Sequence, residues 1–434
     1  MKRGLGLTVI VAMAMALAVA AIPLWASGTN ESGAQSGPKT ITYFTSKPPT
    51  DNVVIAIQKV AAAYKAEGHN VDLVVDTAAD RPAYVQKLRT LVAGNQMPEL
   101  FDLDADPYAA QLGSAGKLVD MAQYLKKIGV YDTYIKNAIE YQRLPDGRIF
   151  SFPNQFVTEM TWYNVDIFNK YNLKAPKTFD EWLQVCKTLA ANGVTPIAID
   201  GMDGWPLMRY IAMVPFRLSG NNYITDLSTG KAKMSDPIGM AGVNFVAQMG
   251  KYFQTGFSST DYTTAKNLFL GGKAAMYEIG TWELTNFISA NLPAGLKVDY
   301  FYMPTTANAV TKPNEYWAFG GIGIAAAKDK FDAQTEAFTT YLIKHYDAVY
   351  LKLQQYPPTK FTISDPSAFD PLFIRVQKDQ AQYGDLACKP WDVLLPADVN
   401  STMADNLVAL ALGKVTPDDF ARVIDQSLAQ NLKK

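Results

Sequence analysis

The sequence has very few of the residues that bind soft metals or form disulfides. Among its 434 residues are two histidines and two cysteines, Cys186 and Cys388. Zinc and similar ions usually take three or four histidine and cysteine ligands, so we expect no metal site and no cofactor. Cys186 lies in a predicted buried helix face (EWLQVCKTLA) and Cys388 in a predicted loop (DLACKP). They could pair in an oxidising compartment, but we expect them to be unpaired.

The chain also lacks a strong excess of either charge. It carries 40 basic and 41 acidic residues, a formal net charge of −1. A nucleic-acid partner would require a basic face, so we expect none. Hydrophobic residues make up 48% of the chain and aromatic residues 12%. At this length the composition suits two or three domains, with rings left over to contact a ligand.

The N-terminus carries a long hydrophobic run between two polar segments. Lys2 and Arg3 precede LGLTVIVAMAMALAVAAIPLWA, and SGTNESGAQSG follows it. This pattern predicts a cleaved signal peptide over residues 1–26, then a flexible leader over 27–39. An uncleaved membrane anchor is the alternative, because the run approaches spanning length, although Pro23 and the polar tract favour cleavage. No cysteine lies near the end of the run, so we expect a periplasmic protein without a lipid anchor.

After the leader, strand and helix patterns alternate. Strand-like stretches at 40–46, 71–76 and 99–106 are separated by helical spacing over 51–67 and a helix opened by Pro82. This order predicts a parallel sheet with helices on its faces. Ligands bind beyond the carboxyl ends of such strands. The stretches at those ends are Thr45–Lys47, Asp76–Arg81 and Asp104–Asp106.

A second unit of the same kind begins after DGRIFSFP (146–153). VTEMTWYN and VTPIAI are strand-like and flank the amphipathic stretch TFDEWLQVCKTLAANG. Thr178 and Glu181 have the spacing of a capping box at the start of that helix. The sequence therefore predicts a second α/β unit, followed by further strands near 274–304 and by helices to the end of the chain.

The stretch GGKAAMYEIGTW (271–282) contains a Gly-Gly-Lys that is similar to a phosphate-binding loop. Such a loop needs serine or threonine after its lysine, but Ala274 follows Lys273. A tight turn at the two glycines and a strand over AAMYEI explain the pattern better. We expect Thr281 to cap a following helix that begins at Trp282.

Several motifs, taken in order, are typical of one known family. They are YVQKLRTLVAGNQMPELFDLDADPYAAQLGSAGKLVDM (84–120), DGRIFSFP and WYNVDIFNKYNLKAPKTFDEW (146–181), GGKAAMYEIGTW (271–282), WAFGGIGIA (317–325) and ALGKVTPDDF (411–420). With these motifs the chain resembles the bacterial extracellular solute-binding proteins of ABC importers, in the maltose-binding-protein-like group. Glu99 and Leu103 depart from the family, which often has aspartate and an aromatic residue at these positions. The departures concern the choice of sugar more than the fold.

The resemblance implies an α/β fold of the two-lobed periplasmic-binding-protein (Venus-flytrap) type, each lobe a central sheet flanked by helices. It assigns 40–150 plus 275–315 to lobe 1 and 151–274 plus 316–434 to lobe 2. The chain would cross between lobes near 147–157, return near 274–282 and cross again near 310–320. The implied function is capture of a sugar or oligosaccharide between the lobes of a monomer, and delivery to the membrane permease subunits of an ABC importer. No catalytic residues are expected.

Three acids, Asp102, Asp104 and Asp106, alternate and would project to one side of a strand. They do not form a calcium loop, because the sixth and twelfth positions are Pro107 and Gly113. A carboxylate pair for glycoside hydrolysis and helix capping by Asp106 stay open. The resemblance implies that Asp104 and Asp106 bond sugar hydroxyls.

Tryptophans supply the aromatic side of the predicted site. An indole ring can cover the apolar C–H face of a sugar while polar neighbours bond its hydroxyls. The resemblance implies this role for Trp282, with an ordinary core position as the alternative. Trp205, in the glycine-rich stretch DGMDGWPL, is a candidate for an opposing ring, with Asp203 beside it.

The remaining candidates are selected by position. Ser46 and Lys47 end the first strand, and Asn154 follows a predicted corner. Trp317 and Gly321 lie at the last predicted crossing, where glycine permits close backbone approach. The last candidate is Asn400, near a ligand position that the resemblance implies, with Trp391 as an alternative.

Two other readings of the chain stay open. A secreted glycosidase or lyase would also use paired carboxylates and tryptophans, although no nucleophile elbow or metal motif appears. The same fold could instead bind a polyamine, an iron complex or an osmolyte. Asp104 and Asp106 together with tryptophans could form an aromatic cage for a cation.

Overall fold

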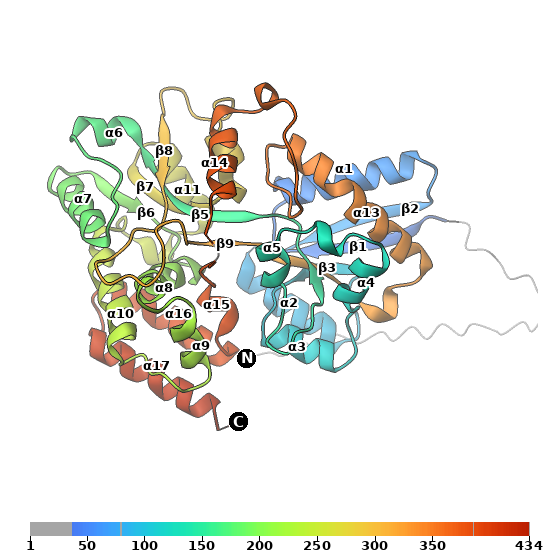
Figure 1. Ribbon diagram of the computed structural model, residues 1–434. Helices are drawn as coiled ribbons and strands as arrows, with labels where there is room; N and C mark the ends of the chain where they lie inside the picture. The colour runs from blue at the N-terminus through green and yellow to red at the C-terminus, as the bar shows by residue number, and fades with distance from the viewer. Residues whose placement is uncertain (1–36, 79, 385, 434) are drawn as a thin grey trace, which may run out of the picture. The chain divides into compact units, whose positions relative to one another are not determined.

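The computed structural model describes residues 37–78, 80–384 and 386–433 (Figure 1). The predicted signal peptide (1–26) and most of the leader (27–39) lie outside these described residues. Among the helices in the described ranges, none has the length and hydropathy needed to cross a membrane.

Strands β1, β2 and β3 of the first sheet are parallel, as the alternating pattern predicts, whereas β10 makes the whole sheet mixed. Its order is β2–β1–β3–β10–β4, with β1 parallel to both β2 and β3, and β10 antiparallel to β3 and β4. These strands are β1 (Lys39–Thr45), β2 (Val71–Thr77), β3 (Leu100–Leu103), β4 (Ser151–Phe152) and β10 (Gly323–Ala326). Successive side chains enter different cores: Tyr43 packs with one hydrophobic cluster and Phe44 with another.

Helices cover both faces of the first sheet, and α1 packs on α13 over one of them. The helices of this group are α1 (Asn52–Ala66), α2 (Arg81–Ala93), α3 (Pro107–Ser114), α4 (Met121–Lys127), α5 (Lys136–Tyr141) and α13 (Ala333–Lys352), with the 3-10 turns η1 (Tyr131–Thr133) and η5 (Lys328–Lys330). We call this sheet and its helices the first lobe.

The second sheet has the order β6–β7–β5–β8, and β9 also pairs with β5. Its strands are β5 (Val157–Asn164), β6 (Thr195–Ala198), β7 (Ala274–Gly280), β8 (Val298–Phe301) and β9 (Ala318–Phe319). This sheet and its helices form the second lobe. The whole is the expected mixed α/β arrangement of two sheets flanked by helices.

Helices also surround the second sheet, and the predicted capping box of Thr178 and Glu181 opens α7. The helices are α6 (Val165–Lys170), α7 (Phe179–Ala191), α8 (Trp205–Ser219), α9 (Asn222–Ser228), α10 (Pro237–Met249), α11 (Tyr262–Leu270), α12 (Leu284–Phe287), α14 (Pro371–Ala381), α15 (Trp391–Leu394), α16 (Ala397–Ala411) and α17 (Pro417–Asn431). The short 3-10 turns are η2 (Gly250–Tyr252), η3 (Phe257–Ser259), η4 (Thr281–Glu283) and η6 (Pro366–Ala368).

The assignment of 275–315 to the first lobe is wrong for its strands. Both β7 and β8 pair with β5 in the second sheet, so β7 does not return the chain to the first lobe. Conversely, β10 and α13 belong to the first lobe although they fall within 316–434. The reason is that β7 is buried along its whole length, and a strand buried on both faces carries no alternating pattern that would indicate its sheet.

Three short segments connect the lobes. Residues 153–156 join β4 to β5, and residues 320–322 join β9 to β10. Residues 353–356 follow α13 and lead to Tyr356, which packs in the second lobe. The crossings expected near 147–157 and 310–320 thus lie close to real ones, whereas the expected return near 274–282 does not occur.

Both cysteines, Cys186 and Cys388, are buried and free, as expected. Burial raises the pKa of each thiol above its usual value. The two thiols are therefore held in the protonated form at neutral pH, which is the unreactive form.

Candidate functional site

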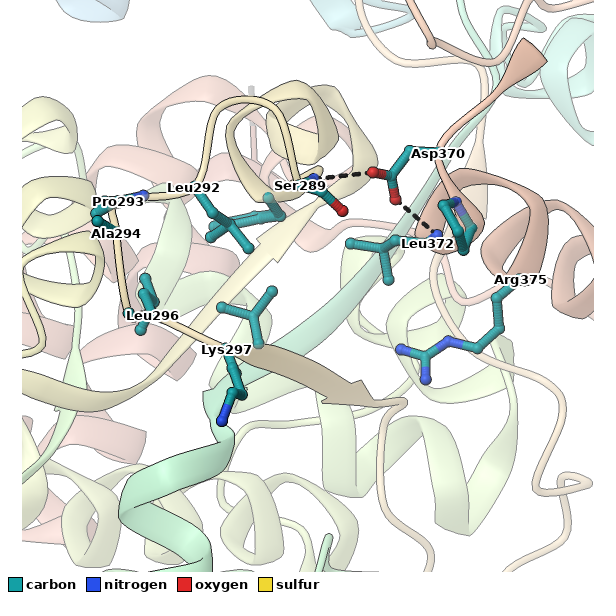
Figure 2. Close-up of a pocket in the computed structure, with 13 residues that line it drawn as sticks. Ser289, Leu292, Pro293, Ala294, Leu296, Lys297, Asp370, Leu372 and Arg375 are labelled. Atoms are coloured by element: carbon teal, nitrogen blue, oxygen red, sulfur yellow. Dashed lines mark hydrogen bonds between the residues drawn. The ribbon is translucent and has the colours of Figure 1, made fainter. Parts of the chain in front are cut away.

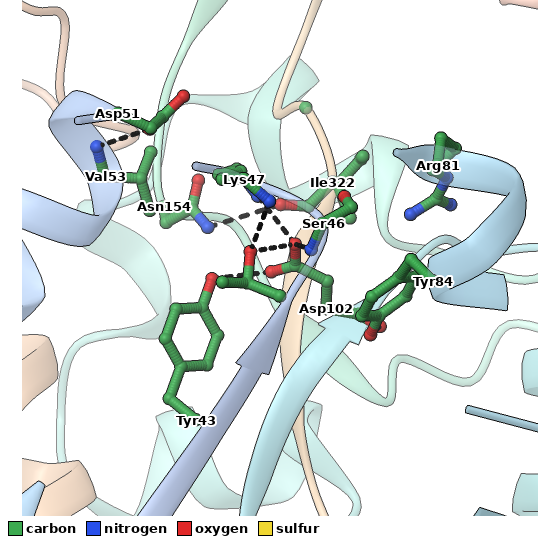
Figure 3. Close-up of polar contacts among 12 residues, drawn as sticks. Tyr43, Ser46, Lys47, Asp51, Val53, Arg81, Tyr84, Asp102, Asn154 and Ile322 are labelled. Atoms are coloured by element: carbon green, nitrogen blue, oxygen red, sulfur yellow. Dashed lines mark hydrogen bonds and ion pairs between the residues drawn. The ribbon is translucent and has the colours of Figure 1, made fainter. Parts of the chain in front are cut away.

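Asp102, on β3, organises the carboxyl end of the first sheet (Figure 3). Its carboxylate is fully buried and accepts hydrogen bonds from the hydroxyls of Tyr43 and Thr45, each at 2.6 Å. Lys47 Nζ pairs with it at 2.9 Å, and the Ser46 amide is 3.4 Å away. Ser46 and Lys47 therefore stand at the predicted place, but the ammonium group of Lys47 is committed to Asp102.

Asp104 follows β3 and forms an ion pair with Arg81, the first residue of α2. Asp104 Oδ1 and Arg81 Nη1 are both buried and have no hydrogen-bond partner among the described residues. Burial raises the pKa of Asp104 to about 6, although the nearby Arg81 charge lowers it. The ion pair therefore offers a free acceptor, Asp104 Oδ1, and a free donor, Arg81 Nη1. A hydroxyl group could donate to the first and accept from the second.

The three alternating acids have different roles, because β3 ends at Leu103 and the strand alternation ends with it. Asp102 is a structural anchor, and Asp104 lies beyond the strand. Asp106 is the N-cap of α3 and accepts a hydrogen bond from the amide of Ala109 at 2.8 Å. Helix capping, the alternative for Asp106, is what its contacts show.

A buried arginine lies between two of the candidate tryptophans. The guanidinium group of Arg209, on α8, lies 5.2 Å from the ring centre of Trp205 and 5.3 Å from that of Trp317. Its Nε contacts both oxygens of Glu159, at 2.8 and 3.1 Å, and its Nη1 contacts Asp392 at 2.5 Å. The carboxylates of Glu159 and Asp392 and the two indole rings therefore hold the guanidinium group of Arg209 in place.

Asn400 supports this cluster from α16. Its side-chain amide donates to the backbone carbonyl of Asp392 at 2.8 Å. The alternative, Trp391, is fully buried in the core of the second lobe. Asn400 therefore holds the start of α15, from which Asp392 reaches Arg209.

Trp282 follows β7 in η4 and is partly exposed. Its indole N–H donates to the Tyr262 hydroxyl at 2.8 Å, and its ring meets Trp205 edge to face at 6.1 Å and 64°. A Cβ at Gly280 would lie 2.0 Å from the Trp282 ring, so only glycine fits there. Thr281 does not cap a helix as expected, because its hydroxyl accepts from the Thr158 amide at 3.2 Å.

Asp203 precedes α8 and is half-buried. Its amide donates to Asp200 Oδ1 at 3.0 Å, and Asp200 Oδ2 is buried without a partner among the described residues. Burial, and then the charge of Asp200, raise the pKa of Asp203 to about 7. This pair places a second group of carboxylates beside Trp205.

Two candidates lie in the crossing segments. Asn154 is fully buried, donates to the Ile322 carbonyl at 3.3 Å, and leaves its Oδ1 without a partner among the described residues. Gly321 has a φ of 62°, and a Cβ there would lie 2.4 Å from Gln155 Nε2. The glycine therefore accommodates the neighbouring Gln155 side chain, and its contact with a ligand stays a prediction.

Electrostatic interactions join the candidates of the two lobes. Burial, followed by the charges of Asp104 and Asp392, raises the pKa of Tyr141 well above its usual value. Asp104 and Tyr141 come from the first lobe, and Asp392 and Arg209 from the second. The carboxyl end of the first sheet therefore faces the Arg209 cluster.

Several residues of this arrangement were missed from the sequence: Glu159, Arg209, Asp392 and Tyr141. An arginine within the apolar run WPLMRYIAMVPF was the available signal, since a buried cation needs partners. Arg81 lay inside a stretch that the predicted strand ends selected, but it was not chosen.

One cavity lies elsewhere, in the second lobe (Figure 2). It measures about 540 Å³ and is lined by the loop 289–297 and the start of α14, including Asp370 and Arg375. Asp370 holds its two walls together by accepting from the amides of Ser289 and Leu372, at 2.9 and 2.8 Å. No predicted site residue lines this cavity.

Two α/β lobes, three crossing segments, and a set of charged and aromatic residues between them define a solute-binding protein. The chain belongs to the bacterial extracellular solute-binding protein family, whose sequence model matches residues 50–345. It is 24% identical over 324 residues to the multiple sugar-binding protein of Streptococcus mutans serotype c, covering 71% of this chain and 73% of that protein.

Two further relatives differ in what their names describe. The sn-glycerol-3-phosphate-binding periplasmic protein of Brucella abortus is 24% identical over 241 residues, which are 52% of this chain and 54% of that protein. The solved structure of a chitin oligosaccharide binding protein aligns with a TM-score of 0.81 and 21% identity over 92% of this chain and 100% of that one. The latter similarity concerns the fold.

Proposed function

We propose that this protein binds a sugar or oligosaccharide between its two lobes and delivers it to the membrane subunits of an ABC importer, without catalysing a reaction. The observation that carries the proposal is the pair of buried, unpartnered atoms, Asp104 Oδ1 and Arg81 Nη1. A hydroxyl group can donate to the first and accept from the second. The names of the relatives, which include sugar- and oligosaccharide-binding proteins, support the same ligand class.

Two of the buried acids near the site, Glu159 and Asp102, are held in place by cations. Glu159 is fully buried, and both of its oxygens contact Arg209. Asp102 is saturated by Tyr43, Thr45 and Lys47. Carboxylates held in this way position other groups, and these two are not free to act as the acid, base or nucleophile of a glycosidase.

The two lobes are proposed to close on the ligand by bending at 153–156, 320–322 and 353–356. A ligand that contacts both lobes stabilises the closed state by its differential affinity for it. In this division, lobe 1 comprises residues 38–152 and 323–352, and lobe 2 comprises 157–319 and 357–433.

The direct test is a thermal-shift screen of the mature protein against mono- and oligosaccharides. A ligand at 100 times its Kd stabilises the folded state by about 2.7 kcal/mol, so a true ligand should raise Tm by a few degrees. Polyamines and osmolytes belong in the same screen. If they alone raise Tm, the fold serves a different ligand, and if bound glycans are hydrolysed, the protein is an enzyme.

Trp282 offers the sharpest test of where the ligand binds. Trp282→Ala should weaken affinity about tenfold or more, which is ~1.4 kcal/mol, because the exposed part of its ring would cover an apolar sugar face. Tyr341→Ala, on α13 among His69, His345 and Glu67, is the matched aromatic truncation and should leave affinity unchanged. Calorimetry measures both. Unchanged affinity in the Trp282 variant would assign that ring to the core alone.

We further propose that residues 1–26 are removed on export and that the mature protein is a periplasmic monomer. The N-terminal sequence pattern and the extracellular character of the family support this proposal. Intact mass of the periplasmic protein should place its N-terminus near residue 27, and light scattering should give the mass of one chain. A retained N-terminus or a dimeric mass would contradict it.

A further inference from the structure

Thr285, in α12 of the second lobe, is bonded both to the first lobe and to a crossing segment. Its hydroxyl oxygen accepts from Asn52 Nδ2 at 2.8 Å and from Gln355 Nε2 at 2.6 Å. The same hydroxyl donates to the backbone carbonyl of Leu353 at 3.5 Å. A hydroxyl group has two acceptor lone pairs and one proton, so its hydrogen-bonding capacity is fully used. Of these three partners, Asn52 is the one that belongs to the first lobe.

The crossing segment beside this hydroxyl is attached to the second lobe. Gln354 Oε1 accepts from the Asp370 amide at 2.8 Å, and Tyr356 is buried in the core of the second lobe. Gln354 also has a φ of 54°, a left-handed conformation that is uncommon for residues other than glycine, so the chain turns where α13 ends. Bending between the lobes therefore falls at the end of α13, and the bond from Gln355 to Thr285 stays within the second lobe.

The bond from Asn52 to Thr285, by contrast, joins two separately fixed bodies. Asn52 is the first residue of α1, whose N-cap Asp51 accepts from the Val53 amide at 2.7 Å, and α1 packs on α13 of the first lobe. Thr285 lies in α12, which is anchored by Phe287 in the core of the second lobe. A hydrogen bond of this kind spans a range of only about 0.5 Å. The bond therefore forms in one arrangement of the lobes and breaks when they rotate apart.

We propose that the Asn52–Thr285 hydrogen bond stabilises the closed arrangement of the lobes and so sets ligand affinity without touching the ligand. Two atoms of the proposed site, Asp104 Oδ1 and Arg81 Nη1, are covered from solvent in this arrangement, which is the expected feature of a closed state. The inference rests on the proposed function and deepens it. The apparent Kd is the intrinsic Kd divided by the fraction of molecules in the binding-competent state, so a contact that raises this fraction tightens binding.

The arrangement of the lobes can be measured without any ligand. The native thiols of Cys186 and Cys388 are buried, so cysteines introduced by Gln111→Cys on α3 and Lys187→Cys on α7, both exposed positions, take spin labels selectively. Double electron–electron resonance then gives the distances between the two lobes. Asn52→Ala should lower the population at the distance of this structure about threefold relative to more open arrangements, which is the effect of one neutral hydrogen bond.

The same variant should weaken saccharide binding. The probes are maltotriose, cellotriose, xylotriose and chitotriose, and calorimetry with the one that raises Tm most should show a Kd about threefold higher in Asn52→Ala. Asn291→Ala is the matched control. Asn291 Nδ2 also donates to Thr285, at 2.7 Å, but it does so to the backbone carbonyl and from within the second lobe. This control should leave both the label distances and the Kd unchanged.

A double-mutant cycle tests whether the effect of Asn52 passes through Thr285. Thr285→Val keeps the shape of the side chain and removes its hydroxyl, so adding Asn52→Ala to it should change neither the label distances nor the Kd further. An equal effect of Asn52→Ala with and without the hydroxyl would assign Asn52 to direct ligand contact and overturn this inference. Unchanged label distances in Asn52→Ala would overturn it too, and the proposed function would stand in both cases. Failure of every saccharide in the wider screen would overturn both.

Discussion

Arg217→Met should lower the free energy of unfolding by about 4 kcal/mol or more, which places it among the most damaging single substitutions. Arg217 lies in the last turn of α8 and is fully buried. It donates to the segment between β8 and β9. The acceptors are the carbonyls of Met303 (2.6 Å), Pro304 (2.9 Å), Lys312 (2.7 Å) and Glu315 (2.6 Å) and the hydroxyl of Thr311 (3.0 Å).

The size of the effect follows from what remains in the variant. Methionine fills much of the arginine volume, so the cavity cost is small, but the carbonyls lose their donor. Each buried polar group left unpaired costs about 1–3 kcal/mol. Chemical denaturation measures the loss. Arg422→Met removes an exposed arginine that pairs with Asp419 on α17 and should stay within about 0.5 kcal/mol of wild type. If Arg217→Met lowered the free energy of unfolding as little, water would be replacing the guanidinium group as hydrogen-bond donor to these carbonyls.

Arg209→Met should cost about 3–5 kcal/mol, because it leaves the fully buried Glu159 without its partner. Arg375→Met is the matched control: Arg375 also lies over a ring, that of Tyr300, and pairs with one acid, but its side chain is 46% exposed. Arg375→Met should lower the free energy of unfolding by less than about 1 kcal/mol. Equal losses in the two variants would contradict this reasoning.

The pH dependence of the unfolding free energy shows whether the unpaired Glu159 causes the loss of stability in Arg209→Met. In the wild type, burial raises the pKa of Glu159 and Arg209 opposes the rise. Without Arg209, the folded-state pKa of Glu159 should rise further above its unfolded value. A group of this kind destabilises the protein as pH rises, since the folded state then binds more protons than the unfolded state. The loss should therefore be smaller at pH 5 than at pH 8, and Glu159→Gln added to Arg209→Met should recover much of it.

The sequence predicted the first lobe better than the second. Strands β1, β2 and β3 of the first sheet follow one another with helices between them, so local patterns and the rule for parallel sheets were sufficient for these three. The second sheet is built from strands far apart in the chain, and β7 is buried on both faces. Its place was decided by hydrogen-bond register with β5, which no local pattern encodes.

The candidate site shows the same division. Asp104 was selected by its place at a strand end, Trp282 by the family resemblance and Trp205 by its glycine-rich stretch, and their roles in binding stay predictions. Arg209 was missed because its partners, Glu159 and Asp392, lie 50 and 183 residues away. Asp102 and Asp104 are two residues apart and equally acidic. Only the end of β3 at Leu103 separates an anchor from a residue with a free oxygen.

The three crossing segments have a mechanical consequence. Hydrogen bonds connect them to one another. Asn154 donates to the backbone carbonyl of Ile322 at 3.3 Å, and the Phe156 amide donates to the backbone carbonyl of Tyr356 at 2.9 Å. Three short connecting segments that are hydrogen-bonded side by side resist twisting and sliding of one lobe against the other, but they allow the lobes to bend toward each other. The two lobes thus have one soft degree of freedom, a rotation about the line through these segments. Ligand energy is then directed into a single coordinate, and the bound state has one defined geometry to present to a partner.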